Sequence, residues 1–166
     1  LLAMVGSYDF NDEKFGKFNA ALGLRQPGSA IKPITYALAF EKGYTPSTVV
    51  MDLKTAFPQT GQADDVPENY DGKFRGPMQL RFTLGNSINI PAVKTLNTVG
   101  VDNMVFMGKK MGIGSWTDPQ QYGLSITLGG ADVTMYDMAI VYGTLANGGV
   151  RKDLSPILKI TNYKEE

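Results

Sequence analysis

The sequence Arg25-Gln26-Pro27-Gly28-Ser29-Ala30-Ile31-Lys32-Pro33 decides both the fold and the chemistry. From Ala30 onward, apolar residues recur at helical spacing, which predicts a helix from about Ser29 to Lys42. Pro33 fits this helix only near its start, because the N–H groups of a first turn have no helical partner. The stretch therefore predicts a serine at a helix N-terminus, with Lys32 on the same face one turn later.

This spacing is suited to nucleophilic catalysis. A lysine amine beside a serine hydroxyl can accept its proton when burial or a nearby cation lowers the lysine pKa. The helix N-terminus favours negative charge that develops on an attacked carbonyl. Taken alone, however, the pattern S-x-x-K arises readily by chance, and a surface serine beside a solvated lysine is then the simpler interpretation.

A second candidate is Ser87-Ile88-Asn89. A serine hydroxyl there can relay a proton, and an asparagine amide can bind a peptide substrate. The alternative is structural, because Ser and Asn are also the residues that cap a helix, and Pro91 can open one. The bare S-x-N pattern favours the cap.

Composition narrows the chemistry further. The chain has 166 residues, which fits one domain or a large part of one. It has no His, which excludes a Ser-His-Asp triad, and no Cys, which excludes thiolate nucleophiles, disulfides and Cys-based zinc sites. Lys+Arg and Asp+Glu are equal at 16 each, so no basic surface argues for nucleic acid. We expect no cofactor and no metal, and we find no apolar run that could span a bilayer and no signal peptide.

The remaining pattern predicts an α+β fold that is weighted toward helices. Strands are expected at 1–5, 15–22 and 156–161, and an irregular region at 44–77 holds an extended piece at 49–51. Helices are expected at 77–84 and 91–99, from Asp102 as N-cap to about 112, and at 134–145 after a capping box. This sheet is small for so many helices, as if part of it were missing.

The residues around Ser29 resemble the active-serine motif of penicillin-binding proteins, especially the class A kind. The resemblance continues in the family's order through further blocks at 39–52, 67–70, 80–93, 128–134 and 145–149. It implies the transpeptidase fold shared with serine β-lactamases. Residues 1–166 would be an incomplete single domain of that fold, with the helical part and the first strands of a five-stranded antiparallel sheet.

The resemblance also implies roles for the candidate residues. Ser29 would be the nucleophile, acylated by the D-Ala-D-Ala end of a peptidoglycan stem peptide or by a β-lactam antibiotic, and its backbone N–H would be half of the oxyanion hole. Lys32 would be its base. Ser87 would carry protons to and from the leaving and attacking amines, Asn89 would hold the substrate amide, and Tyr70 is a candidate for the border of the site.

The sequence departs from the family at the third motif, K-T-G, which is absent. Lys54-Thr55 and Lys94-Thr95 are followed by Ala56 and Leu96, and the second pair lies on a predicted helix. We therefore expect the chain as it stands to lack useful transpeptidase activity, and to self-associate or pair with a complementary chain. The parent protein is expected to be membrane-anchored and to act on the extracytoplasmic face of the bacterial membrane.

Three alternatives remain open. A class A β-lactamase shares the S-x-x-K start but needs a Glu that activates water, and no Glu lies between Asn89 and Tyr163. A D,D-carboxypeptidase differs only in using water as the acyl acceptor. A non-catalytic fragment or binding module is the alternative from another class, and the missing K-T-G favours it for the chain alone.

Overall fold

The computed structural model describes residues 1–58, 61 and 63–164. In it, helices surround one central helix, and a small sheet lies beside them. In chain order the elements are η1 (Gly28–Ile31), α1 (Lys32–Glu41), β1 (Val49–Asp52), β2 (Gly76–Gln79), α2 (Leu80–Gly85), α3 (Asn89–Val99), α4 (Val101–Met111), η2 (Pro119–Gln121), η3 (Leu124–Leu128) and α5 (Met135–Ala146). The predicted α+β class is confirmed.

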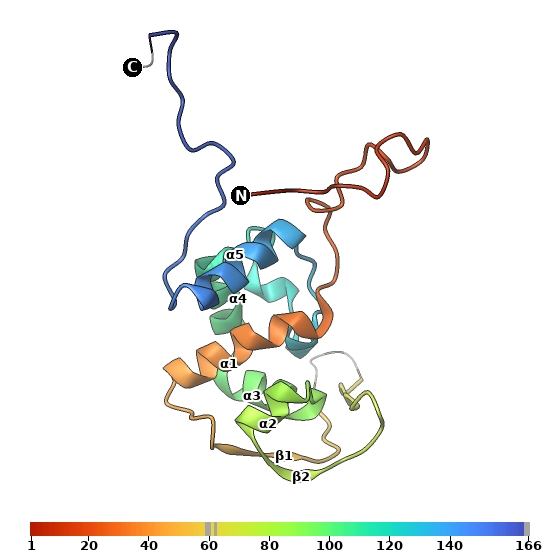
Figure 1. The fold of residues 1–166 in the computed structure, drawn as a ribbon. Coiled ribbons are helices and arrows are strands. Elements are labelled where there is room, and N and C mark those ends of the chain that lie inside the picture. The colour runs from red at the N-terminus through yellow and green to blue at the C-terminus, as the bar shows by residue number, and fades with distance from the viewer. Residues whose placement is uncertain (59–60, 62, 165–166) are drawn as a thin grey trace.

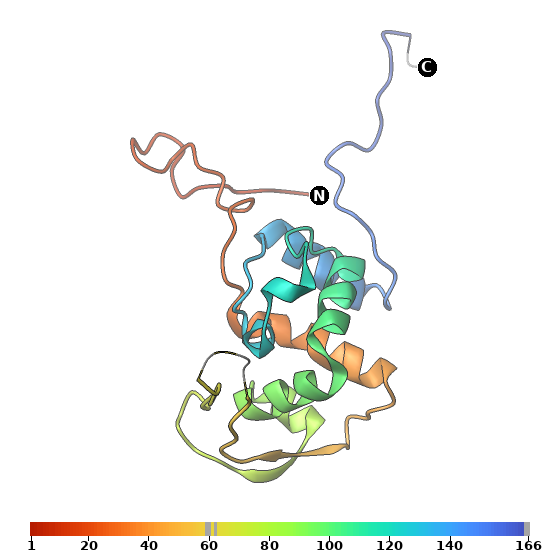
Figure 2. The same cartoon turned by 180° about the vertical axis from the view of Figure 1, so that it is seen from behind.

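Helix α1 crosses the middle of the molecule (Figure 1). The helices α4 and α5 lie on one side of it, and α2, α3 and the two strands lie on the other, as the reverse view also shows (Figure 2). Apolar side chains of α1 are buried in one cluster with residues of α3, α4 and the later loops, among them Ile34, Leu38, Leu96, Met104 and Trp116. The element that carries Lys32 is therefore held from both sides.

The helix predicted at 29–42 is confirmed, with a difference in its first turn. Residues Gly28–Ile31 form a tight 3₁₀ turn, and the α-helix begins at Lys32. Pro33 lies in the first turn of α1, where its missing N–H removes no helical hydrogen bond.

The sheet consists of β1 and β2, paired antiparallel with Val49 opposite Gln79 and Met51 opposite Pro77. The extended piece predicted at 49–51 is thus confirmed, but a helix starting at Pro77 is wrong, since the residues before Leu80 form β2. In a sheet of two strands both strands are edges. Proline has no N–H to donate, so an edge strand tolerates it where its nitrogen faces away from the neighbouring strand.

The strands predicted at 1–5, 15–22 and 156–161 are wrong, because the structure has turns and irregular backbone there. The C-terminal segment runs away from the helical body (Figure 1), whereas the first residues line a small pocket with Met135 and Tyr136 of α5. Ala20 donates one backbone hydrogen bond to Gly6, but no strand of the described chain lies beside either segment to form a ladder. Without cross-strand partners, an alternating apolar pattern does not by itself make a strand.

The later helices agree with the sequence pattern. Helices α3, α4 and α5 correspond to the segments predicted from Pro91, Asp102 and Thr134. Asp102 lies inside the first turn of α4 and is not its N-cap, which is Gly100. The capping box of α5 is confirmed: Asp137 N–H donates to Thr134 Oγ1 at 2.9 Å, and Thr134 N–H donates to the Asp137 carboxylate at 3.3 Å. Across the described residues, no helix combines the length and apolar character needed to span a membrane.

Candidate active site

Ser29 lies in η1, directly before α1, and its side chain is exposed. Its hydroxyl has no hydrogen-bond partner among the described residues. Its backbone N–H is in the first turn of the helical segment, where N–H groups have no partner within the helix. The residue therefore offers both a free hydroxyl and a free N–H to a molecule that binds in front of it.

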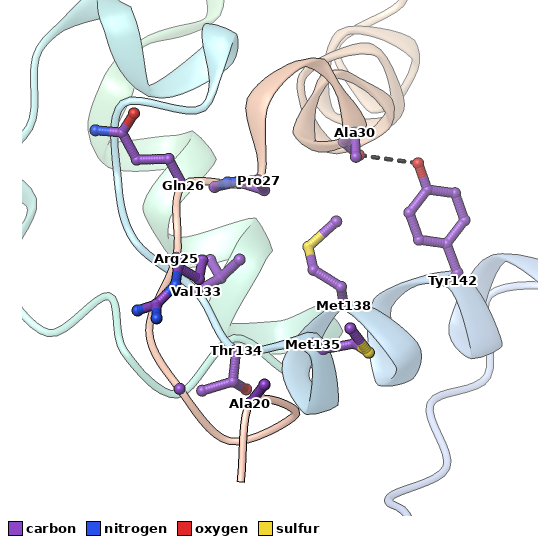
Figure 3. Close-up of a pocket in the computed structure, with 11 residues that line it drawn as sticks. Ala20, Arg25, Gln26, Pro27, Ala30, Val133, Thr134, Met135, Met138 and Tyr142 are labelled. Carbon is purple, nitrogen blue, oxygen red and sulfur yellow. Dashed lines mark hydrogen bonds between the residues drawn. The ribbon is translucent and has the colours of Figure 1, made fainter. Parts of the chain in front are cut away.

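The turn that carries Ser29 is held by residues far along the chain. Gly129 follows η3 and approaches so closely that a Cβ atom on it would overlap the backbone of Gly28. From α5, the Tyr142 hydroxyl donates a 2.9 Å hydrogen bond to the Ala30 carbonyl (Figure 3). Position 129 must therefore be a glycine for this turn to keep its place.

Lys32 is buried, with 1% of its surface exposed, and its amine contacts the turn between α2 and α3. The Nζ atom donates to the Ser87 carbonyl at 2.7 Å, to Ser87 Oγ at 3.1 Å and to Asn89 Oδ1 at 2.7 Å. No carboxylate in the described ranges forms an ion pair with it. Burial lowers the pKa of Lys32 from 10.5 to about 8, so a substantial fraction of the amine is neutral near physiological pH.

The backbone at Ser87 is unusual. With φ of 53°, Ser87 is the only non-glycine residue of the described chain in the left-handed region. The N–H of Ser87 donates to Leu84, and that of Ile88 donates to Thr83, which closes the end of α2. Residues held in such conformations cluster at functional sites. Here the strained turn presents both the carbonyl and the hydroxyl of Ser87 to the amine of Lys32.

The structure thus brings Lys32, Ser87 and Asn89 into one hydrogen-bonded group, although more than 50 residues separate Lys32 from the other two along the chain. Ser29 lies one turn before Lys32 but has no hydrogen bond to the Lys32 amine. Such catalytic contacts are often long in a free enzyme and tighten when substrate binds. The arrangement can take up a proton from Ser29 and pass it on through Ser87.

Asn69 and Asp52 lie next to this group but were not predicted as part of it. Asn69 accepts hydrogen bonds from the N–H groups of Asn89 and Ile90, and it donates to Asp52. Its neighbour Tyr70 is fully exposed instead. Asn69 lies in the block at 67–70 that resembles the family, and that was the available signal.

A pocket of about 360 Å³ lies beside the Ser29 turn (Figure 3). It is mainly apolar, and its lining includes Pro27, Ala30, Met135, Met138 and Tyr142. The four candidate catalytic residues do not line it, so the candidate site lies outside this pocket. Among the described residues, no group of three or more acidic or metal-binding side chains is placed to hold a metal ion.

Comparisons with known proteins identify the family of this chain. The sequence matches the family model for the penicillin binding protein transpeptidase domain over residues 1–166. Penicillin-binding protein 1A of Neisseria meningitidis is 37% identical over 160 residues, and that of Haemophilus influenzae is 37% identical over 149 residues. These alignments cover 95% and 89% of this chain but only 20% and 17% of the relatives, so the chain spans about a fifth of their length.

Solved structures show the same fold. The crystal structure of penicillin-binding protein 1A from Haemophilus influenzae matches 86% of this chain and 21% of its own, with a TM-score of 0.77 and 36% identity. Penicillin-binding protein A of Mycobacterium tuberculosis, solved as an imipenem acyl-enzyme complex, matches 86% of this chain and 37% of its own, with a TM-score of 0.71 and 23% identity. Because the family model covers the whole sequence, the chain belongs to the transpeptidase family of the penicillin-binding proteins.

Proposed function

We propose that the natural protein containing this chain is a peptidoglycan D,D-transpeptidase, a serine acyltransferase that cross-links stem peptides and is acylated by penicillin and other β-lactams. One observation carries the proposal: the exposed hydroxyl of Ser29 lies one helical turn from a buried lysine whose amine is bound to Ser87 and Asn89. Family membership of the whole chain supports it.

In the first half-reaction, Ser29 Oγ attacks the carbonyl of the penultimate D-Ala of a stem peptide. Its proton passes to the neutral amine of Lys32, and a bond forms between Oγ and the carbonyl carbon. The backbone N–H of Ser29 stabilises the negative oxygen of the tetrahedral intermediate. Because the amine is 3.1 Å from Ser87 Oγ, the proton can move through that hydroxyl to the departing nitrogen as the C–N bond breaks.

In the second half-reaction, an amine of another stem peptide attacks the acyl-enzyme. Ser87 and Lys32 take the proton of this amine, the ester bond to Ser29 breaks, and Oγ regains its proton. Asn89 presents its amide next to the same path and binds the substrate backbone. A β-lactam enters the first half-reaction only, because its opened ring stays attached to the acyl carbon and blocks the attacking amine.

We propose that residues 1–166 are part of one transpeptidase domain of a membrane-anchored protein that acts on the extracytoplasmic face of the bacterial membrane. The chain contains no K-T-G motif. In the family that the sequence resembles, the K-T-G strand provides the second oxyanion donor, and losing a single such donor typically costs about a hundred- to a thousand-fold in rate. The isolated chain is therefore expected to show no useful transpeptidation, and its exposed apolar terminal segments are expected to promote association.

The test is labelling of the natural full-length protein with fluorescent penicillin, followed by mass spectrometry of the labelled peptide. We expect one adduct on Ser29, loss of labelling in Ser29→Ala, and normal labelling in Ser155→Ala, which removes an exposed hydroxyl elsewhere. An adduct on another residue, or labelling that survives Ser29→Ala, would overturn the proposal.

A second assay addresses the acceptor. A donor peptide ending in D-Ala-D-Ala is supplied with and without an acceptor amine, and the products are separated by mass. Transfer to the amine supports transpeptidation, whereas release of D-Ala with water as the sole acceptor identifies a carboxypeptidase. Rapid turnover of penicillin would identify a β-lactamase. A protein that binds the donor peptide but forms no product would be a binding module.

A further inference from the structure

The segment between β1 and β2 reaches the candidate site through the side chain of Asn69, which is buried with 5% of its surface exposed. Asn69 Oδ1 accepts from the backbone N–H groups of Asn89 at 3.0 Å and Ile90 at 3.2 Å. These are the first residues of α3, and the N-cap residue of that helix, Ile88, provides no side-chain cap. Asn69 therefore caps α3 from another part of the chain.

The orientation of this amide is fixed from behind. Asn69 Nδ2 donates to Asp52 Oδ1 at 2.7 Å and to the Lys73 carbonyl at 2.8 Å. Both donors and the acceptor of the amide are thus used. A rotation by 180° would turn its NH₂ group toward the two N–H groups of α3 and leave Asp52 Oδ1 without a donor.

Asp52 is the last residue of β1 and is fully buried. Its second oxygen, Oδ2, accepts from the Arg75 backbone N–H at 3.0 Å, and the Arg75 guanidinium lies 3.7 Å away. The carboxylate at the end of β1 is therefore bonded to the residue that directly precedes β2. Burying a carboxylate is expensive unless it is hydrogen-bonded and paired, and here both conditions are met.

On the other side, the same segment holds the side chain of Asn89. Asn89 Nδ2 donates to the Glu68 carbonyl at 2.9 Å, while Oδ1 accepts from Lys32 at 2.7 Å. Glu68 and Asn69 thus grip Asn89 by its amide group and by its backbone N–H. This grip leaves Oδ1 as the atom that faces the lysine amine.

We propose that Asn69, held by the buried carboxylate of Asp52, is a positioning residue that sets Asn89 and thereby the amine of Lys32. A line of direct hydrogen bonds runs from Asp52 through Asn69 and Asn89 to Lys32. Neither Asp52 nor Asn69 touches the reacting atoms. The inference rests on the proposed function, in which Lys32 is the base for Ser29.

The test exchanges the two partners in the natural full-length protein. Asn69→Asp keeps the acceptor for α3 but sets a second carboxylate against Asp52. Asp52→Asn places two amides together. The single oxygen of the new amide can accept from Asn69 or from the Arg75 N–H but not from both, so one hydrogen bond is lost. In the double variant Asp52→Asn with Asn69→Asp, the asparagine at 52 can donate to the aspartate at 69, and the net charge equals that of the wild type. The hydrogen bond from position 69 to the Lys73 carbonyl is not restored, because an aspartate carboxylate has no N–H to donate. Asn97→Asp, at an exposed position near the end of α3, is the matched control.

The readout is acylation by fluorescent penicillin, resolved into the dissociation constant of the first complex and the acylation rate constant of the bound complex, per folded protein. We expect each single variant to lower the rate constant about tenfold or more with little change in the dissociation constant. The double variant should recover part of the loss, since only the hydrogen bond to the Lys73 carbonyl stays absent, and Asn97→Asp should match the wild type. Unchanged rate constants in the single variants would overturn the proposal. A double variant whose rate constant is no higher than that of either single variant would overturn it as well.

A second measurement is independent of the reaction. A lysine ammonium held by three acceptors exchanges its protons slowly with water, and NMR of ¹⁵N-labelled lysine side chains detects this. We expect the Lys32 signal to weaken through faster exchange in both single variants and to return in the double variant. If Ser29→Ala is still labelled, the proposed function fails, and this measurement alone decides the positioning role. A Lys32 signal that is identical in all variants would refute it.

Discussion

The Lys32→Arg substitution is expected to remove the general base while it keeps the positive charge. An arginine guanidinium stays protonated throughout the range in which proteins are stable, so it cannot accept the proton of Ser29. A lysine in the same place can do so because it is buried, and burial penalises its charged form.

The size of the effect follows from the pKa of Lys32, which is lowered from 10.5 to about 8. At pH 7 a group with a pKa of 8 is about 9% neutral, and one with a pKa of 10.5 is about 0.03% neutral, a difference of about 300-fold. The neutral form is the base, so the rate rises with pH. We expect the wild-type acylation rate to increase about tenfold between about pH 7 and about pH 9 and then to level off.

The assay measures the rate of fluorescent-penicillin labelling of the natural full-length protein across this pH range. Lys42→Arg, the same substitution at an exposed lysine just after α1, is the matched control and should keep the wild-type profile. Lys32→Arg should lower the rate by about a hundred-fold or more and abolish the rise. A wild-type rate that does not change with pH, or a Lys32→Arg variant with the wild-type profile, would refute the role of Lys32 as base.

Substitutions at three positions test the supports of the site and of α5. Gly129→Ala should lower stability by about 2 kcal/mol or more and slow acylation, since its Cβ would overlap Gly28, whereas Gly148→Ala, also at positive φ but in open space, should show a smaller loss in denaturant titrations. Ser87→Ala and Ser87→Gly should both slow acylation about a hundred-fold, yet the glycine variant should be about 1 kcal/mol more stable because it accepts the left-handed backbone; equal stabilities would argue against strain there. Thr134→Ala should cost about 1 kcal/mol by removing the cap of α5 and leave acylation per folded molecule unchanged, and a large loss of activity would contradict its purely structural role.

Local sequence signals predicted the helices well. The placement of Pro33 and the spacing of apolar residues after Ser29 predicted α1, and Thr134 with Asp137 predicted the start of α5. Each of these signals involves residues only a few positions apart, so the sequence alone is enough to predict these helices. The two-stranded sheet was harder to predict, because whether Pro77 opens a helix or joins a strand depends on a partner at Met51, far away in the sequence.

The terminal segments show the same limit. Residues 1–5 and 156–161 have apolar patterns that suit strands, but a strand forms only beside another. The apolar pattern indicates that these segments could pair with a neighbouring strand, but it does not show whether such a strand is present. Their apolar side chains, such as Leu2 and Leu158, are exposed in the structure.

The candidate site was predicted mainly by resemblance. Spacing connects Ser29 with Lys32, but nothing in the spacing connects either residue with Ser87 or Asn89, and the pattern S-x-N alone favoured a helix cap. The structure places Ser87 and Asn89 against the Lys32 amine. Their catalytic roles stay a prediction. The cap of α3 comes from Asn69, 20 residues earlier, and no local rule identifies a cap from so far away.

The contact between Gly28 and Gly129 also limits how this sequence can evolve. Any side chain at 129 would displace the backbone that leads into Ser29. Few single substitutions at 129 can therefore reshape the surroundings of Ser29 from this direction. Gly28 itself has open space where a Cβ atom would stand, so only its φ of 56° restricts that position, whereas Gly129 is restricted both by its φ and by the contact.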